Sequence, residues 1–239
     1  MIELEAPAKL TVSLRITGVL TDGMHLIDAE MVSLDLADRL VLEDGANGVV
    51  VEGHDVGSVA DNLVQRALDL VQRQARVVVH KAIAPGGGLG GGSADAAAIL
   101  AWAGYDDLAG AAALGADVAF CLVGGRARVT GIGEQIEPLP FEARTYTLLT
   151  PPFGCSTPAV YRRWDEMGGP QGEADNDLEP AAVSLWPELV RYRDALGDVA
   201  GSRPRLAGSG STWFVEGAHR GHGHVVVRTI GPRAPGRAV

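Results

Sequence analysis

A run of six glycines around one leucine, at residues 86–92, carries the clearest chemistry in the chain. Glycine has no Cβ, so such a loop can adopt positive φ at several positions and turn its N–H groups toward one point. The helix formers that follow from Ser93 place that point at a helix N-terminus, where the first N–H groups lack partners and the helix dipole is positive. These properties predict an anion site, and a phosphate chain is the anion expected there.

Other interpretations of the glycine run fit less well. A flexible linker does not usually join a hydrophobic strand to an alanine-rich helix. A Walker A loop needs a lysine before its Ser or Thr, and here Gly92 precedes Ser93, which excludes it. A dinucleotide-binding GxGxxG pattern would use Gly86, Gly88 and Gly91, followed by Asp106 and Asp107. Because a glycine tract satisfies many such patterns, this dehydrogenase interpretation, which predicts NAD binding, is the less favoured alternative.

The two lysines of the chain are the other residues whose placement suggests chemistry. Lys9 and Lys81 are the only lysines among 20 Lys and Arg residues. One lies near the start of the chain and the other just before the glycine run. An arginine fork is wider than an ammonium and cannot lose its proton, so we expect these two positions to need a lysine.

Composition limits the classes of function. The 239 residues with 46% hydrophobic content can bury a core, in one large domain or two small ones. The formal charge of −10 argues against a nucleic-acid surface. Cys121 and Cys155 are too few for a disulfide framework or a zinc site. Residues 1–10 contain no apolar signal region and no run approaches 18 apolar residues, so we expect a cytoplasmic protein that is neither exported nor bound to a membrane.

The elements that must position these residues follow from periodicity and turn signals. In the first part of the chain we expect strands at 2–5, 9–19, 49–52 and 76–80, and a long extended stretch at 28–43 with a break near 35–38. A helix is expected at 62–73, with Asp61 as its N-cap. Its apolar face would consist of Leu63, Ala67, Leu70 and Val71. A second helix starts at Ser93, directly after the glycine run.

The second part of the chain mixes short helices and strands. We expect helices at 107–114, 157–166 and 186–196, a hairpin of 126–130 with 135–139, and strands at 145–150, 212–216 and 224–229. Pro151, Pro152 and Gly154 mark the expected boundary between a domain at 1–150 and a domain at 151–239. Because helices and strands do not alternate strictly, the pattern predicts an α+β fold.

Three stretches resemble, in order and spacing, the motifs of the GHMP kinase superfamily: APAKL at 6–10, PGGGLGGGSADAAA at 85–98 and AGSGST at 207–212. Four more stretches are similar to the family within it that phosphorylates 4-diphosphocytidyl-2-C-methyl-D-erythritol, in the non-mevalonate route to isoprenoids. They are DGMH at 22–25, LGADV at 114–118, STPAVY at 156–161 and NDLE at 176–179. The resemblance covers about residues 7–229, and it implies a two-lobed α+β kinase with its active site in the cleft between the lobes.

For the nucleotide, the resemblance implies that the glycine loop cradles the phosphates of ATP, with Mg²⁺. The loop residues would be Pro85, Gly86, Gly87, Gly88, Leu89, Gly90, Gly91, Gly92, Ser93 and Ala94. Ser93 would add a hydroxyl to the phosphate or to the Mg²⁺ shell, or act only as a helix N-cap. Lys81 matches a family lysine that precedes the loop and would lie near the nucleotide. The Mg²⁺ ligands stay unassigned.

For catalysis, Asp117 matches the catalytic aspartate of the family and Lys9 matches its lysine partner. An alcohol is a poor nucleophile until a base in hydrogen-bond reach can accept its proton, which is the role implied for Asp117. Lys9 would orient that carboxylate and attract the phosphoryl oxygens. As an isolated residue, Asp117 would more often be a cap or a turn residue, and the surrounding LGADV match favours the catalytic role instead.

For the substrate, the resemblance implies that His25 hydrogen-bonds the cytosine edge and that Tyr161 stacks on its ring. Thr157 would contact the substrate, and because it lies four residues before Tyr161 on an expected helix, both could face one pocket. At two positions the chain departs from the family pattern: Met24 replaces a tyrosine that would complete an aromatic sandwich, and Thr11 replaces an asparagine. Met24 can pack on a base through its polarizable sulfur.

Three functions therefore remain open. The favoured one is the ATP-dependent kinase of the cytidyl substrate, a small-molecule enzyme with no nucleic-acid or membrane partner, acting as a monomer or homodimer. The departures at Met24 and Thr11 also permit a related kinase of another small alcohol. The third is a paralogue that binds nucleotide without catalysis, against which the joint presence of Lys9 and Asp117 argues.

Overall fold

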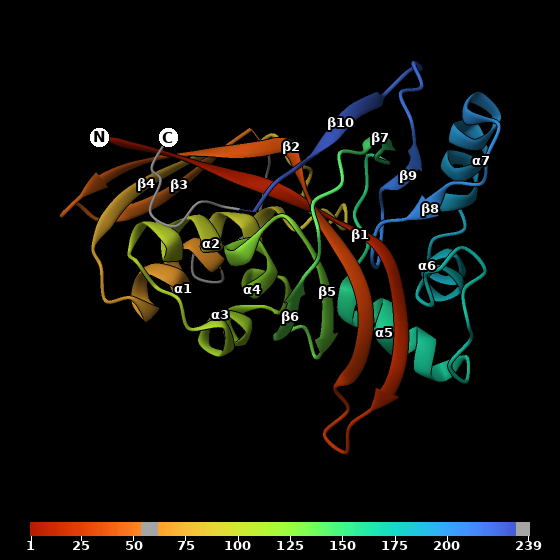
Figure 1. The fold of residues 1–239 in the computed structure, drawn as a ribbon, viewed down its shortest axis with the longest axis horizontal. Coiled ribbons are helices and arrows are strands. Elements are labelled where there is room, and N and C mark those ends of the chain that lie inside the picture. The colour runs from red at the N-terminus through yellow and green to blue at the C-terminus, as the bar shows by residue number, and fades with distance from the viewer. Residues whose placement is uncertain (54–61, 233–239) are drawn as a thin grey trace.

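The computed structural model of the protein describes residues 1–53 and 62–232. Within those residues ten strands form one sheet and seven helices pack against it (Figure 1). The structure confirms the α+β class. No helix in the described ranges combines the length and the apolar character needed to cross a membrane.

A long antiparallel pair of strands forms the spine of the molecule (Figure 1). Strand β1 covers Ile2–Val19 and strand β2 covers His25–Asp44. The two strands expected at 2–5 and 9–19 are therefore one, and the break expected near 35–38 does not interrupt β2. The pairing of β1 with β2 changes register between Pro7 and Lys9 and again between Thr11 and Ser13. Such bulges re-aim side chains without ending the pairing, and Lys9 lies beside one of them.

The other strands of the first part of the chain flank β2. Strand β4 (Ala75–His80) pairs antiparallel with β2, and β3 (Gly48–Glu52) pairs parallel with β4. Strand β5 (Arg126–Gly131) pairs with β2 and forms the expected hairpin with β6 (Gln135–Pro138). Strand β4 ends at His80, and the short segment 81–85 connects it to the glycine run.

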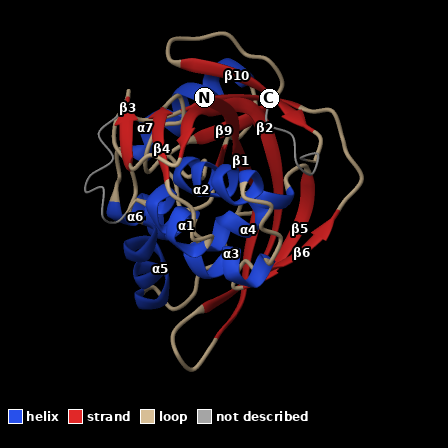
Figure 2. Ribbon diagram, turned by 90° about the vertical axis from the view of Figure 1, so that its left-hand side faces the viewer, coloured by secondary structure: helices blue, strands red, loops and turns tan. Residues whose placement is uncertain are grey.

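Four helices gather on one face of the sheet (Figure 2). They are α1 (Leu63–Leu70), α2 (Gly91–Trp102), α3 (Leu108–Leu114) and α4 (Ala116–Val123). Helix α2 is central, because every residue from 94 to 100 is buried. A helix that is apolar all round is typical of such a buried position.

Several details of these helices differ from expectation. Helix α1 ends at Leu70, and its N-cap is Asn62, whose side chain accepts from the N–H of Val64 at 2.9 Å; Asp61 lies outside the described residues. Leu70 is exposed, so its placement on the apolar face is wrong. Helix α4 was not expected at all. The extended backbone at Gly115 (φ 178°) separates it from α3, and the short spacing hides the second helix.

The remaining elements lie on the other side of the β1–β2 spine (Figure 1). Helix α5 (Thr157–Glu166) agrees with expectation, α6 (Glu179–Leu185) was not expected, and α7 (Leu189–Ala200) begins three residues later than the predicted start at 186. Pro187 delays that start, because proline disfavours helical conformation in the residue before it.

Strand pairing crosses the expected domain boundary. Strand β7 (Thr145–Leu149) pairs with β9 (Trp213–Glu216) and β10 (His224–Ile230), and β9 also pairs with the short β8 (Arg205–Leu206). Strand β10 then pairs with β2 at Thr229 and Ile230. The sheet is therefore continuous between the parts before and after residue 150, and the division into 1–150 and 151–239 stays a proposal.

Candidate active site

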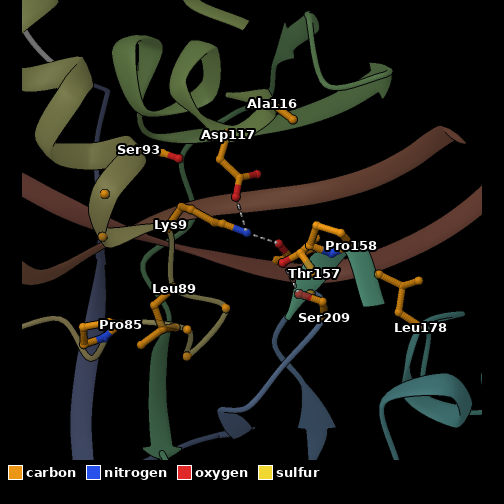
Figure 3. Close-up of a pocket in the computed structure, with 18 of the residues that line it drawn as sticks. Lys9, Pro85, Leu89, Ser93, Ala116, Asp117, Thr157, Pro158, Leu178 and Ser209 are labelled. Carbon is orange, nitrogen blue, oxygen red and sulfur yellow. Dashed lines mark hydrogen bonds and ion pairs between the residues drawn. The ribbon is translucent and has the colours of Figure 1, made fainter. Parts of the chain in front are cut away.

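A cavity of about 770 Å³ lies between the glycine run, β1, α4 and α5. Nearly every residue that the sequence analysis singled out lines it. These residues are Lys9, Thr11, Met24, His25, Lys81, Pro85, Gly86, Gly87, Gly88, Leu89, Gly90, Gly91, Gly92, Ser93, Asp117, Thr157 and Tyr161. Ala94 is buried behind the wall and does not line the cavity. Figure 3 shows Lys9, Asp117, Ser93, Thr157 and Ser209 around the same space.

The glycine loop leaves several N–H groups free at the start of α2. The N–H groups of Gly88, Leu89 and Gly90 have no acceptor among the described residues. Gly90 is the N-cap of α2 in left-handed conformation (φ 67°), so the helix begins at Gly91. Ser93 is therefore the third helical residue, and the N-cap role considered for it is wrong. Free N–H groups at a helix N-terminus are suited to bind an anionic phosphate.

A second small-residue loop, at residues 206–212, packs on the glycine loop. The N–H groups of Ser211 and Thr212 donate to the carbonyls of Gly86 (3.2 Å) and Gly87 (3.1 Å). The buried Asn176 holds this second loop, because its Nδ2 donates to the carbonyls of Leu206 (2.8 Å) and Gly208 (2.7 Å). The NDLE stretch thus has a structural role, because its asparagine holds the loop that packs on the glycine loop.

Gly88 is the position at which this packing tolerates no side chain. Its φ is +78°, and a Cβ there would lie 2.1 Å from the carbonyl oxygen of Ala207. We expect Gly88→Ala to lower the free energy of unfolding by about 2–4 kcal/mol, from left-handed strain and from the clash together. We also expect it to abolish the thermal stabilisation by a non-hydrolysable ATP analogue.

Gly92→Ala is the matched control for this prediction. A Cβ at Gly92 meets only Leu63 Cδ1, at 3.7 Å, which is an ordinary contact. This variant should keep the free energy of unfolding of the unaltered protein in urea denaturation. If the two alanine variants had the same free energy of unfolding, the close packing of the two loops would not contribute to stability.

Lys9 and Asp117 contact each other at one end of the cavity (Figure 3). Lys9 Nζ lies 3.0 Å from Asp117 Oδ2 and donates to Thr11 Oγ1, also at 3.0 Å. The lysine side chain is 6% exposed, whereas that of Asp117 is 30% exposed and can be reached by a substrate. Asp117 is in the first turn of α4, where the helix dipole favours a negative charge. The arrangement offers an accessible carboxylate as proton acceptor and a buried ammonium beside it.

Lys9 is also tied to the glycine loop. Its backbone N–H donates to the carbonyl of Leu89 at 3.0 Å, and its side chain passes so close to Gly90 that a Cβ there would lie 2.7 Å from Lys9 Cγ. The lysine side chain therefore lies beside Gly90, the last of the three loop residues named above for their free N–H groups. The hydroxyl of Thr11 accepts a hydrogen bond from the Lys9 ammonium, and its contact with a substrate stays a prediction.

Lys81 lines the cavity, but two buried carboxylates hold its ammonium. Nζ contacts Asp38 Oδ2 and lies 2.8 Å from Asp95 Oδ2, and the lysine side chain is 4% exposed. Asp38 Oδ1 also accepts from the N–H groups of Ala82 (2.6 Å) and Ile83 (2.9 Å), at the start of the loop. Lys81 Nζ lies directly under Gly91, where a Cβ would be 2.9 Å away. These contacts tie β2, the loop entry and α2 together.

Of the two carboxylates that hold Lys81, Asp95 has fewer hydrogen-bond partners than Asp38. Its Oδ1 is buried without a hydrogen-bond partner, and burial raises the pKa of Asp95 to about 7. Burial therefore favours the neutral form of Asp95 more strongly in the folded protein than in the unfolded chain. The stability contributed by this pKa difference is fully present below the unfolded pKa of about 3.9. It is lost as the pH rises through the folded pKa of about 7.

We therefore expect Asp95→Asn to change the pH dependence of stability. Relative to Asp95→Asn, the free energy of unfolding of the unaltered protein should be about 2–3 kcal/mol more favourable at pH 5 than at pH 8. Urea denaturation of both proteins at the two pH values measures this difference. An offset that is the same at pH 5 and pH 8 would contradict the assigned burial of the carboxyl group.

The opposite end of the cavity is lined by α5 and the start of β2. His25 and Tyr161 have ring centroids 4.7 Å apart, and Thr157 Oγ1 lies 2.8 Å from Ser209 Oγ. Burial, with a smaller effect of Asp117, raises the pKa of Tyr161, so its phenol stays neutral. Met24 is 46% exposed at the rim. This end offers an aromatic surface and hydroxyl groups, together with the charged side chains of Arg162 and Asp165.

Several residues that shape the site were not expected from the sequence. Asp38 and Asp95 hold Lys81, Asp165 lies 2.8 Å from His25 Nε2, and Ser209 and Leu178 line the cavity. Two signals could have indicated them. Asp95 is a single acid in an alanine-rich helix that must be buried, and Asp165 continues the i, i+4 series of Thr157 and Tyr161.

Comparison with known proteins agrees with this geometry. Residues 62–125 match the family model "GHMP kinases N terminal domain". The 4-diphosphocytidyl-2-C-methyl-D-erythritol kinase of Paracoccus denitrificans is 37% identical over 231 residues, which cover 87% of this chain and 84% of that protein. The enzyme of the same name from Cereibacter sphaeroides (strain KD131 / KCTC 12085) is 34% identical, covering 99% of this chain and 96% of that protein.

A solved structure supports the same relationship. The crystal structure of a 4-(cytidine 5'-diphospho)-2C-methyl-D-erythritol kinase superposes with a TM-score of 0.79 at 29% identity, covering 96% of this chain and 100% of that chain. A mevalonate kinase shares the fold, with a TM-score of 0.59 at 11% identity, over 97% of this chain and 100% of that chain. The chain belongs to the 4-diphosphocytidyl-2-C-methyl-D-erythritol kinase family, within the GHMP kinase superfamily.

Proposed function

We propose that this protein transfers the γ-phosphoryl group of ATP to the 2-hydroxyl of 4-diphosphocytidyl-2-C-methyl-D-erythritol, in the non-mevalonate route to isoprenoid precursors. The observation that carries the proposal is the pairing of Lys9 and Asp117 at 3.0 Å, beside a loop with free N–H groups. The relatives that bear this enzyme name cover most of the chain. The two proposed lobes, 1–150 and 151–239, would each contribute one wall of the cavity.

The glycine loop fits the phosphate chain of a nucleotide. The unpartnered N–H groups of Gly88, Leu89 and Gly90 and the N-terminus of α2 would bind its oxygens and stabilise the charge of the transferring group. The described residues contain no group of three His, Cys, Asp or Glu side chains that could hold a metal ion. This agrees with the usual binding of Mg²⁺ through substrate phosphates and few protein oxygens, which neutralises their charge.

Asp117 and Lys9 would act on the acceptor hydroxyl. The exposed carboxylate of Asp117 accepts the proton of the substrate alcohol as the oxygen attacks phosphorus in line. Lys9 fixes that carboxylate through the 3.0 Å contact, and its ammonium attracts the phosphoryl oxygens. Thr11 holds the lysine from the other side, which makes it a positioning residue in this mechanism.

The opposite end of the cavity would bind the cytidyl group. Tyr161 and Met24 would pack against the faces of the base, and His25 would hydrogen-bond its edge. The hydroxyl of Thr157, placed by Ser209, would contact the substrate between the base and the reacting hydroxyl group. Lys81 would act through the loop rather than on the nucleotide directly, because its ammonium is already held by two carboxylates.

A substrate panel tests this proposal against its alternatives. The measurement is conversion of ATP to ADP with the cytidyl substrate, with homoserine and with mevalonate, each at several concentrations. We expect turnover with the cytidyl substrate alone. Turnover with another alcohol instead would identify a different kinase, and binding of an ATP analogue without turnover of any alcohol would indicate a protein that only binds nucleotide.

A further inference from the structure

Three side chains on one face of α5 contact the imidazole of His25. The residues that contact it are Tyr161, Trp164 and Asp165, which recur at the spacing of one helical face. The Trp164 ring meets His25 edge-on at 5.6 Å, and its own indole N–H is fixed by the carbonyl of Pro170 at 2.9 Å. Asp165 Oδ1 lies 2.8 Å from His25 Nε2. The histidine side chain is 10% exposed, so its orientation is fixed by the helix.

The contact with Asp165 determines which nitrogen of His25 carries the proton. An ionised carboxylate only accepts hydrogen bonds, so Nε2 must be the donor. In a neutral imidazole Nδ1 is then an acceptor, and it has no hydrogen-bond partner among the described residues. His25 and Asp165 both line the cavity. The pair therefore leaves one acceptor without a partner on a residue that lines the end of the cavity opposite to Lys9 and Asp117.

We propose that Asp165 is a specificity-determining positioning residue: it holds His25 as the Nε2–H tautomer, so that Nδ1 accepts a hydrogen bond from the exocyclic amine of cytosine. The inference rests on the proposed function for the presence of a cytidyl group. Cytosine carries an amino donor where uracil carries a carbonyl acceptor. A uridyl substrate would place two acceptors against each other, and such an unsatisfied pair disfavours binding.

The first test compares the cytidyl substrate with its uridyl analogue. We expect the unaltered protein to favour the cytidyl form by about 10-fold or more in kcat/KM. In Asp165→Ala the imidazole is free to take the other tautomer and to donate from Nδ1. The kcat/KM for the cytidyl form should then fall through KM and that for the uridyl form should rise, with kcat nearly unchanged. A merely structural role would lower both values together, which would overturn the proposal.

Glu166→Gln is the matched control. Glu166 is the next acid on the same helix, is 63% exposed, contacts Arg163 and does not line the cavity. It should keep the discrimination between the two bases. Because the Asp165 side chain is 46% exposed, its replacement should not unfold the protein, and this is checked by thermal denaturation.

The second test observes the tautomer itself in the free protein. Long-range ¹H–¹⁵N correlation of ¹⁵N-histidine-labelled protein at pH 8, assigned with His25→Gln, should show a protonated Nε2 and an unprotonated Nδ1. In Asp165→Ala the signals should shift toward a mixture of tautomers. A proton on Nδ1 in the unaltered protein would overturn the inference. Absence of turnover with either nucleotide form would refute the proposed function instead, and the two failures are thus distinguishable.

Discussion

The Asp117→Asn variant is expected to lower kcat by about 10²- to 10⁴-fold, the range found when a general base is removed. The amide keeps the shape of the side chain and can still accept a hydrogen bond from Lys9 Nζ, now 3.0 Å from Asp117 Oδ2. It cannot take a proton from the substrate alcohol. Because the free N–H groups of the glycine loop are untouched, nucleotide affinity should stay within about a factor of three, an allowance well below 1 kcal/mol.

Steady-state kinetics and calorimetric titration with an ATP analogue separate these two effects. Asp106→Asn is a suitable control, because Asp106 is exposed and does not line the cavity. It should match the unaltered protein in both measurements. A kcat for Asp117→Asn equal to that of the control would remove Asp117 from the mechanism.

The Lys81→Met variant is expected to lower the free energy of unfolding by about 3–5 kcal/mol. Methionine fills a similar volume but removes the cation between Asp38 and Asp95, whose side chains are 0% and 6% exposed. Two buried carboxylates would then face each other without compensation. Because these residues join β2, the loop entry and α2, the variant should also weaken binding of an ATP analogue. Urea denaturation at pH 8 measures the first effect.

Two comparisons make this prediction specific. Arg128→Met removes an exposed ion pair with Asp28 and should cost less than about 1 kcal/mol. Adding Asp95→Asn to Lys81→Met should recover part of the lost stability, because one of the two unpaired charges is then gone. A loss below about 1 kcal/mol in Lys81→Met would show that the buried ion pairs do not stabilise the loop.

The fold was predictable where the local signal is strong. The strand, glycine loop and helix unit at residues 75–102 follows from β-branched residues, glycines and alanines in succession, and the hairpin of β5 and β6 follows from its turn. The continuity of β1 and β2 was not predictable, because bulges that keep two strands paired leave no periodic signal. Helices α4 and α6 are short, and most of their stability comes from packing that propensity does not report.

The site was predictable as a set of positions but not as a set of contacts. Motif matching located Lys9, Asp117 and the glycine loop, which the fold brings to one cavity from separate segments between residues 9 and 117. Their roles stay proposals. The partners of Lys81 and His25 come from β2, α2 and α5, and only the tertiary fold places Asp38, Asp95 and Asp165 beside them.

The most direct test of the account is the structure of the product. The protein is incubated with ATP and 4-diphosphocytidyl-2-C-methyl-D-erythritol, and the product is examined by ³¹P nuclear magnetic resonance. The account predicts a new phosphomonoester on the 2-oxygen of the erythritol unit, formed by the unaltered protein and not, over the same period, by Asp117→Asn. A phosphate on another oxygen, or no phosphorylated product from a folded protein that binds the ATP analogue, would contradict it.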